Sequence, residues 1–328
     1  MEEQLETNLH LVNKMTGFGY LLHQYFDPSE PKAVIGMDGK NSEVGSSNGG
    51  TGKSLFGDAI GHVVPQVSIP GKTKKPEDDN FYFEEVDERT ANVFIDDVRA
   101  GFDFEFLFPY ITGKFTVNKK GVGKFTLPRE RTPKFYIPTN HALKGEGSSF
   151  KRRQFLIAFS DYYNDKHMPL DDFGVRFFDE WDNYQWNLFY NFCACCLQLY
   201  FKHGLIEGPT ERLELRRLRQ QIGEEFLNWA DEYFSYDEPS GQFEWPNENT
   251  NKPIPRKELN DDFHEKNPTQ KRFVTAAKFK KKFKYYCQYR GAVFNPHKFH
   301  DSAELIPGAD DKSGGIEYFT IADQNYST

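Results

Sequence analysis

Runs of apolar residues divide the first half of the chain into predicted elements. Leu5, Leu9, Val12 and Met15 recur three or four residues apart, which predicts an amphipathic helix or a pair of helices within residues 3–26. Short apolar runs further along predict strands, and one of them has the continuous apolar character of a buried parallel strand. The runs cover residues 33–37, 90–97, 133–140 and 150–159, the second being the continuous one.

The segments between these runs have other patterns. Residues 55–64 have the pattern of a helix, and the Gly-, Pro- and Lys-rich residues 65–80 predict an exposed loop. Residues 114–127 alternate around a Lys-Lys-Gly turn, which predicts a β-hairpin with a cationic tip. Residues 170–205 are rich in aromatic side chains and are predicted to be helical.

Basic residues concentrate near the C-terminus. The chain has a net charge of −8, yet residues 251–300 contain 13 Lys and Arg against 4 Asp and Glu. Such a segment is a candidate nucleic-acid footprint. Within it, residues 275–289 predict a basic helix, followed by a strand at 316–321, and Lys280 and Lys281 are the predicted DNA-binding residues. The alternative is that aromatic residues of this helix form a core and its lysines are the solvated face.

The composition is that of a soluble globular protein. With 328 residues, 38% of them hydrophobic and 27% charged, the chain is expected to form about two domains. No apolar run approaches the ~20 residues that a membrane span needs, and the acidic start of the chain is unlike a signal peptide. We therefore expect no membrane association and a cytoplasmic location.

The strongest chemical signal is a glycine-rich loop between the first apolar run and the helix predicted after it. Residues 43–54 end in Gly-Gly-Thr-Gly-Lys-Ser, and such a loop lets successive backbone N–H groups converge on phosphate oxygens. Lys53 would reach the β- and γ-phosphates, and Ser54 would bind Mg²⁺. Ser47 stands where such loops begin with glycine, and a Gly/Ser-rich linker is the alternative interpretation. The predicted nucleotide-binding residues are Asn48, Gly49, Gly50, Thr51, Gly52, Lys53 and Ser54.

Polar residues end the next two predicted strands. Asp96 and Asp97 follow the second apolar run, and Asn140 follows the third. In NTPases the first carboxylate of such a pair holds Mg²⁺ and the second polarises the attacking water. Asn140 would orient that water or sense the γ-phosphate. The alternative is that these residues form solvated turns, in which Asp and Asn are frequent.

Two cationic pairs are further candidates. Arg152 and Arg153, at the start of the fourth run, would stabilise the transferring phosphoryl group as an arginine finger, or they are surface charges on an edge strand. Lys119 and Lys120, at the hairpin tip, would contact a nucleic-acid backbone, or they protect a strand edge from pairing.

The order of these motifs resembles that of the superfamily 3 helicases of viruses, phages and plasmids, a branch of the AAA+ ATPases. Within that family, the chain resembles the helicase part of phage and poxvirus-type primase-helicases, strongly over residues 30–165 and weakly over 216–328. Asp97 stands where many relatives carry Glu. Motifs A, B, B′ and C of the family resemble residues 47–54, 93–97, 111–127 and 135–140.

The resemblance implies an α/β fold with an AAA+ P-loop core, in which helices flank a mainly parallel sheet. An N-terminal helical segment, this core and a C-terminal winged-helix-like domain are expected at residues 1–28, 29–210 and 211–328. The implied cofactors are ATP and Mg²⁺, held by Ser54 and Asp96.

The implied function is that of an ATP-dependent DNA helicase, which translocates on single-stranded DNA with 3′→5′ polarity and unwinds forked duplex during replication. Its catalytic sites would lie between subunits of a hexameric ring, with Lys53, Asp97 and Asn140 from one subunit and Arg152 or Arg153 from the next. A separate primase or other replication proteins are expected partners, in the bacterial host cytoplasm if the protein is phage-encoded. The alternative is a non-motor, ATP-dependent DNA-binding initiator or loader.

Overall fold

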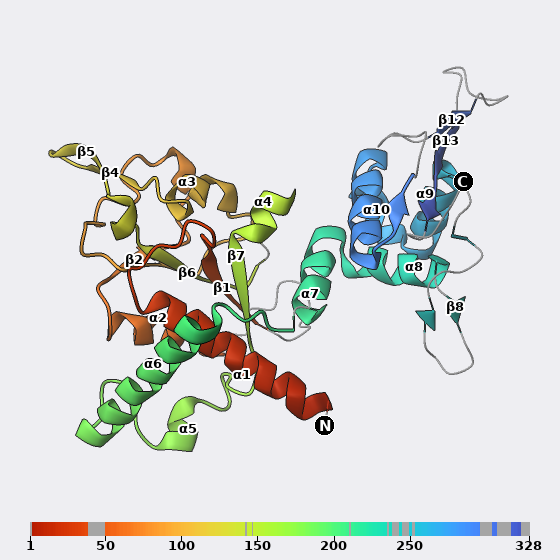
Figure 1. Cartoon of the computed structure of the whole chain (residues 1–328). Coiled ribbons are helices and arrows are strands. Elements are labelled where there is room, and N and C mark those ends of the chain that lie inside the picture. Colours follow the sequence, from red (N-terminus) through yellow and green to blue (C-terminus); the bar gives the residue numbers. More distant parts are fainter. Residues whose placement is uncertain are drawn as a thin grey trace. The chain divides into compact units, whose positions relative to one another are not determined.

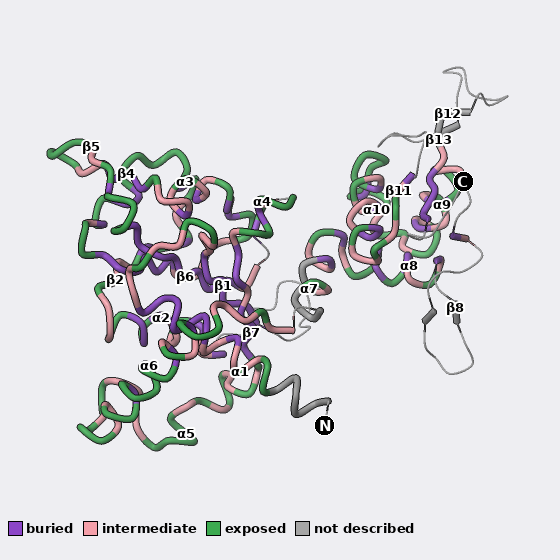
Figure 2. The backbone as a smooth tube through the Cα atoms, in the orientation of Figure 1, coloured by how far each residue is buried: buried purple, intermediate pink, exposed green. Residues whose placement is uncertain are grey.

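The structure, a computed structural model, divides the chain into two compact units, Met1–Leu213 and Glu214–Thr328 (Figure 1). Buried residues are concentrated inside each unit (Figure 2). Asn48 and Gly49 of the predicted nucleotide-binding set lie outside the described residues. The structure describes residues 2–38, 50–141, 143–145, 147–209, 211–234, 236–237, 243–244, 249–250, 253–295, 304–306 and 316–322.

A five-stranded sheet forms the centre of the first unit. Its strand order is β2-β3-β6-β1-β7, and all neighbouring strands are parallel. The predicted α/β fold with a parallel sheet flanked by helices is therefore confirmed. The strands are β1 (Ala33–Asp38), β2 (Gln66–Pro70), β3 (Asn92–Asp96), β6 (Lys134–Thr139) and β7 (Gln154–Phe159).

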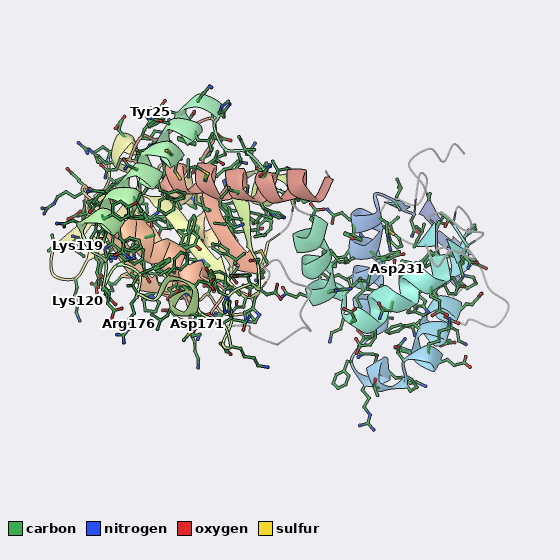
Figure 3. The ribbon with its side chains drawn as sticks, turned by 90° about the horizontal axis from the view of Figure 1, so that it is seen from below. Tyr25, Lys119, Lys120, Asp171, Arg176 and Asp231 are labelled. Carbon is green, nitrogen blue, oxygen red and sulfur yellow. The ribbon has the colours of Figure 1, made fainter. Side chains whose placement is uncertain are left out.

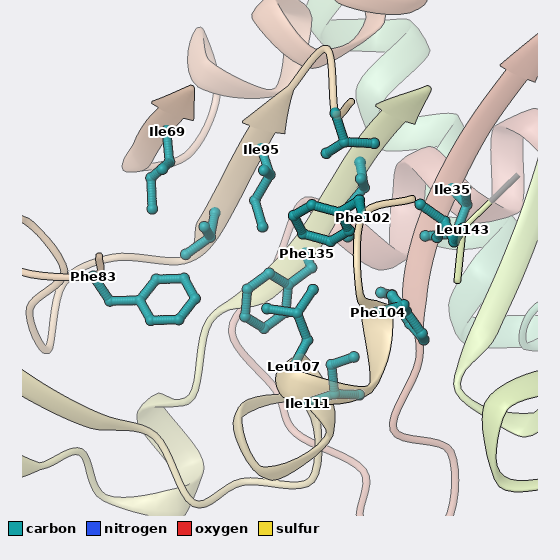
Figure 4. Packing of buried hydrophobic residues seen from close by; sticks show 14 of the residues in the cluster. Ile35, Ile69, Phe83, Ile95, Phe102, Phe104, Leu107, Ile111, Phe135 and Leu143 are labelled. Carbon is teal, nitrogen blue, oxygen red and sulfur yellow. The ribbon is translucent and has the colours of Figure 1, made fainter. Parts of the chain in front are cut away.

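Successive residues of a strand point to opposite sides of the sheet, and every residue of the central strands β1 and β6 is buried, so the sheet is covered on both faces there. On one face, Ile35, Ile95 and Phe135 pack against the segment that contains Phe102 and Leu107 (Figure 4). On the other face, the intervening strand residues pack against helices of the first unit. The sheet is therefore a rigid platform for residues at its strand ends.

Helices α1, α2 and α6 contribute to the second of these cores. Gly19 allows α1 to approach α6 closely, since a Cβ atom there would clash with the carbonyl group of Cys196. The helices of the first unit are α1 (Glu2–Leu21), α2 (Lys53–Gly61), α3 (Phe108–Ile111), α4 (Gly147–Arg152), α5 (Pro169–Phe173) and α6 (Asn183–His203).

Two of the sequence predictions for this unit were wrong in part. The predicted loop at residues 65–80 contains β2, whose edge position and mixed composition give a weak apolar signal. The strand predicted to begin at Phe150 begins at Gln154 instead. Phe150 belongs to α4, where its buried ring contacts Phe104.

The predicted hairpin is confirmed by strands β4 (Thr116–Lys119) and β5 (Gly123–Thr126), which pair antiparallel and extend from the first unit (Figure 1). Gly121 and Gly123 have φ angles of 78° and 101°, a left-handed conformation that glycine adopts without strain.

Within the described residues, the second unit combines helices with small antiparallel sheets around an aromatic core that includes Trp229, Phe263 and Phe283. In neither unit is any described helix long and apolar enough to cross a membrane. Helix α7 (Glu211–Ile222) spans the division between the units. The remaining elements are α8 (Glu224–Phe234), β8 (Tyr236–Asp237), β9 (Phe243–Glu244), β10 (Ile254–Pro255), α9 (Arg256–Lys266), α10 (Ala276–Arg290), β11 (Val293–Phe294), β12 (Glu304–Ile306), β13 (Ile316–Phe319) and β14 (Ile321–Ala322).

Candidate functional site

A pocket of about 490 Å³ lies at the carboxyl ends of β1, β3 and β6, where ligands of parallel α/β sheets bind. Its volume lies within the range of small-molecule sites. It brings together the described part of the glycine-rich loop, both candidate carboxylates and the candidate amide. The lining residues are Gly50, Thr51, Gly52, Lys53, Ser54, Leu55, Asp96, Asp97, Pro138, Thr139, Asn140 and Pro169.

The loop enters α2 through two glycines in the left-handed region. Gly50 and Gly52 have φ angles of 84° and 89°, and no side chain caps the helix at Gly52. The first N–H groups of a helix have no intrahelical acceptor, and together with the helix dipole they favour an anion. The local backbone is therefore suited to a phosphate group.

Lys53, the first residue of α2, has a buried partner that the sequence analysis missed. Its ammonium group forms an ion pair with Asp38 at the end of β1 and donates to Thr51 Oγ1 at 3.0 Å. The Thr51 hydroxyl in turn donates to Asp38 Oδ1 at 2.7 Å. Asp38 ends the first apolar run as Asp96 ends the second, so the same signal would have found it.

The side chain of Tyr136 forms a hydrogen bond with the backbone of Lys53. Its hydroxyl donates to the Lys53 carbonyl at 2.8 Å, and burial raises the pKa of Tyr136 well above its usual value, which keeps this donor protonated. Gly36 makes room for the contact, because a Cβ atom there would lie 2.6 Å from the Tyr136 hydroxyl oxygen.

The two predicted Mg²⁺ ligands lie next to each other. Ser54 Oγ donates to Asp96 Oδ1 at 3.1 Å, so a hydroxyl and a carboxylate oxygen meet beside Lys53. Oxygen donors of this kind are the ligands that Mg²⁺ prefers. The residues present therefore fit this ion.

Asp97 has an unusual backbone and a second missed partner. Its φ angle is 52°, a conformation uncommon for residues other than glycine. Its Oδ2 lies 2.5 Å from Lys72 Nζ, and this hydrogen bond raises the pKa of Lys72. Lys72 follows β2, within the stretch predicted to be a loop.

The other side of the pocket comes from the end of β6 and the segment before α5. Asn140 lies in a tight turn, where the Thr139 hydroxyl accepts from the His141 N–H at 2.9 Å. Pro169 lines the pocket, and the backbone of Asn164 lies close to Gly50. No sequence pattern predicts a role for this segment.

The two arginines lie away from the pocket, at the amino ends of the parallel strands. The Arg153 carbonyl accepts from the Ala33 N–H at 2.8 Å, where β1 and β7 begin. The Arg153 side chain packs over the Phe108 ring at 4.4 Å and donates to the Ser149 carbonyl at 2.9 Å. Arg152 ends α4 and is exposed. Neither side chain reaches the pocket of its own chain.

Lys119 and Lys120 lie at the hairpin tip of the first unit (Figure 3). Lys119 Nζ lies 5.7 Å from the centroid of the Phe125 ring, whereas Lys120 is exposed beside Val122, which is 78% exposed.

In the second unit, the aromatic side chains of α10 belong to the hydrophobic core and its lysines do not. This part of the structure agrees with the alternative interpretation of the basic helix. A hollow of about 310 Å³ is lined by Gln221, Lys278, Lys281, Lys282 and Tyr285. Lys278, Lys281, Lys282 and Tyr285 are spaced three or four residues apart and so share one face of α10, whereas Lys280 belongs to the opposite face. The structure therefore places Lys281, but not Lys280, at this basic hollow.

Two lysines of the hollow donate to backbone carbonyl groups. Lys278 donates to the Phe273 carbonyl at 3.1 Å, and Lys282 donates to the Ile222 carbonyl at the end of α7. Burial lowers the pKa of Lys282.

The solved structures that resemble this chain have low sequence identity to it and low TM-scores. No family model and no curated protein matches the chain. The apo C-terminal region of NrS-1 is 14% identical, with 97% of this chain and 76% of that chain covered and a TM-score of 0.43. A JCV helicase bound to an acetamide compound is 16% identical, with 68% and 61% covered and a TM-score of 0.29.

Proposed function

We propose that this protein is an ATP-dependent DNA helicase of phage or plasmid type, which hydrolyses ATP, translocates on single-stranded DNA and unwinds duplex during replication. One observation carries the proposal. A single pocket joins a left-handed glycine loop and the lysine and serine that follow it to two strand-end carboxylates and a strand-end amide. This set of groups is the one that NTP hydrolysis requires.

Each group has a proposed role in that reaction. Backbone N–H groups of residues 50–54 and the Lys53 ammonium would bind the phosphates. Ser54 and Asp96 would hold Mg²⁺, which neutralises phosphate charge when bound. Asp97 would polarise the attacking water, and Asn140 would orient it.

A ring of subunits would complete this site. The described residues that line the pocket include one lysine and no arginine, whereas phosphoryl transfer in NTPases is accelerated by an arginine finger. Arg152 or Arg153, at the amino ends of the parallel strands, would serve a neighbouring subunit. We propose a hexamer for this ring, as the resemblance implies.

DNA would be bound by the hairpin tip of the first unit and the basic hollow of the second. Lysines at both places supply the sequence-independent contacts that a translocating protein needs. The test of the whole proposal is the rate of ATP hydrolysis with and without single-stranded DNA, together with unwinding of a tailed duplex. Stimulated hydrolysis without unwinding would favour the initiator or loader.

Substitutions of Asp96 and Asp97 are expected to affect different steps, nucleotide binding and hydrolysis respectively. Asp97→Asn should retain binding of Mg·ATP but slow hydrolysis by about 10²–10⁴-fold, because the group that polarises water is lost. Asp96→Asn should weaken nucleotide binding only when Mg²⁺ is present. Calorimetric titration with a non-hydrolysable ATP analogue, with and without Mg²⁺, distinguishes them. Equal behaviour of the two variants would show that this division of roles is wrong.

The hairpin lysines are expected to couple hydrolysis to DNA. Replacing Lys119 and Lys120 with alanine should weaken binding of all single strands alike and reduce the salt slope by about 1.4, if each lysine contacts one phosphate. Basal hydrolysis should persist while stimulation by DNA and unwinding are lost. Lys114→Ala, an exposed lysine before the hairpin, is the matched control. A double variant that unwinds as well as the parent would leave strand-edge protection as the role of these lysines.

A further inference from the structure

Asp38 forms a buried ion pair with Lys53, which lines the pocket. Lys53 is 9% exposed and Asp38 is 4% exposed. The carboxylate of Asp38 compensates the charge of the Lys53 ammonium group. Thr51 closes the arrangement by hydrogen bonds to both side chains. Asp38 itself does not line the pocket, whereas Thr51 and Lys53 do. The carboxylate therefore holds the lysine from behind the phosphate-binding surface.

We propose that Asp38 is a positioning residue that stands in for the phosphate group while the site is empty, and that nucleotide binding requires Lys53 to leave it. This inference rests on the proposed function and names how the same site is regulated. A buried lysine without an anion is unfavourable, so the ion pair stabilises the empty loop. The same pair opposes binding, because the phosphates must take over a cation that is already neutralised.

Removing the charge of Asp38 is expected to change both the nucleotide-free protein and the nucleotide complex in the direction of tighter binding. Removing the charge of Asp38 leaves Lys53 uncompensated in the empty protein, which raises the free energy of that state. It also removes a negative charge from behind bound phosphates, which lowers the free energy of the complex. Both changes tighten the binding of ligands whose phosphates reach Lys53.

Asp38→Asn keeps the size of the side chain and tests this directly. It should bind ADP about tenfold more tightly than the parent, which corresponds to about 1.4 kcal/mol. AMP has no β-phosphate for Lys53 to contact, so its affinity should change less than about twofold. In the Lys53→Ala background, Asp38→Asn should not produce the tenfold gain. Isothermal titration in Mg²⁺-free buffer measures all of these affinities.

Two further variants separate this role from a general effect. Asp58→Asn removes a negative charge from an exposed position on α2 that is near Asp96, and it should leave the affinity for ADP within about twofold of the parent. Thr51→Val keeps every charge but removes the hydroxyl that bridges the pair, and it should tighten ADP binding in the same direction, by about threefold. It provides the test if Asp38→Asn does not fold.

The outcomes distinguish this inference from the proposed function. A parent protein that binds no adenine nucleotide would overturn both. A parent that binds ADP through Lys53, with Asp38→Asn binding ADP equally or more weakly, would overturn the role of Asp38 alone. Equal tightening for ADP and AMP would also contradict it, because the effect would then not depend on Lys53.

Discussion

Lys53→Ala should abolish ATP hydrolysis, with a loss of at least about 10²–10³-fold, the cost of removing one preorganised donor from a reacting anion. The structure adds a second expectation, because the change leaves the buried carboxylate of Asp38 without its cation. Breaking a buried pair by removing one partner typically costs about 3–5 kcal/mol. The midpoint of thermal unfolding should therefore fall together with the activity.

A double variant separates these two effects. Asp38→Asn with Lys53→Ala removes both charges, so it should recover much of the lost stability while hydrolysis stays absent. Circular dichroism melts and a coupled phosphate-release assay measure the two properties on the same samples. Hydrolysis at the parent rate in either folded variant would refute the assignment of this pocket as the ATPase site.

Arg152→Ala should slow hydrolysis by about 10³–10⁵-fold, the range found for arginine fingers. The six residues of β7, about 20 Å of strand, separate this end of the sheet from the end that carries the pocket. The guanidinium group would therefore act on the nucleotide of a neighbouring subunit. Arg152 is the better candidate of the pair, because it is exposed and Arg153 is held by Phe108 and Ser149.

Mixing experiments test the action between subunits. Arg152→Ala protein mixed with Lys53→Ala protein should regain part of the activity, since some interfaces then combine an intact pocket with an intact arginine. Arg153→Ala is the control, and it should lower thermal stability more than it lowers hydrolysis. If mixed assemblies form and no activity returns, Arg152 is a surface charge.

Local patterns were sufficient for the main elements of the candidate site. A phosphate loop depends on glycines at adjacent positions, and a buried parallel strand depends on a continuous apolar run, so both are visible within about ten residues. For this reason the strand ending in Asp96, the hairpin and the strand ending near Asn140 were predicted close to their observed bounds.

Contacts between distant segments were decided only by the tertiary structure. β2 lies at the edge of the sheet, so its sequence carries little apolar signal, and with it Lys72 was missed as the partner of Asp97. The pairing of Asp38 with Lys53 depends on β1 and α2 meeting beneath the loop. Side-chain direction on a helix likewise decided that Lys281 and not Lys280 reaches the basic hollow. The sequence thus determined which chemical groups this protein has, and the packing of its strands and helices determined which of them are paired, because electrostatic partners are selected by distance in space and not along the chain.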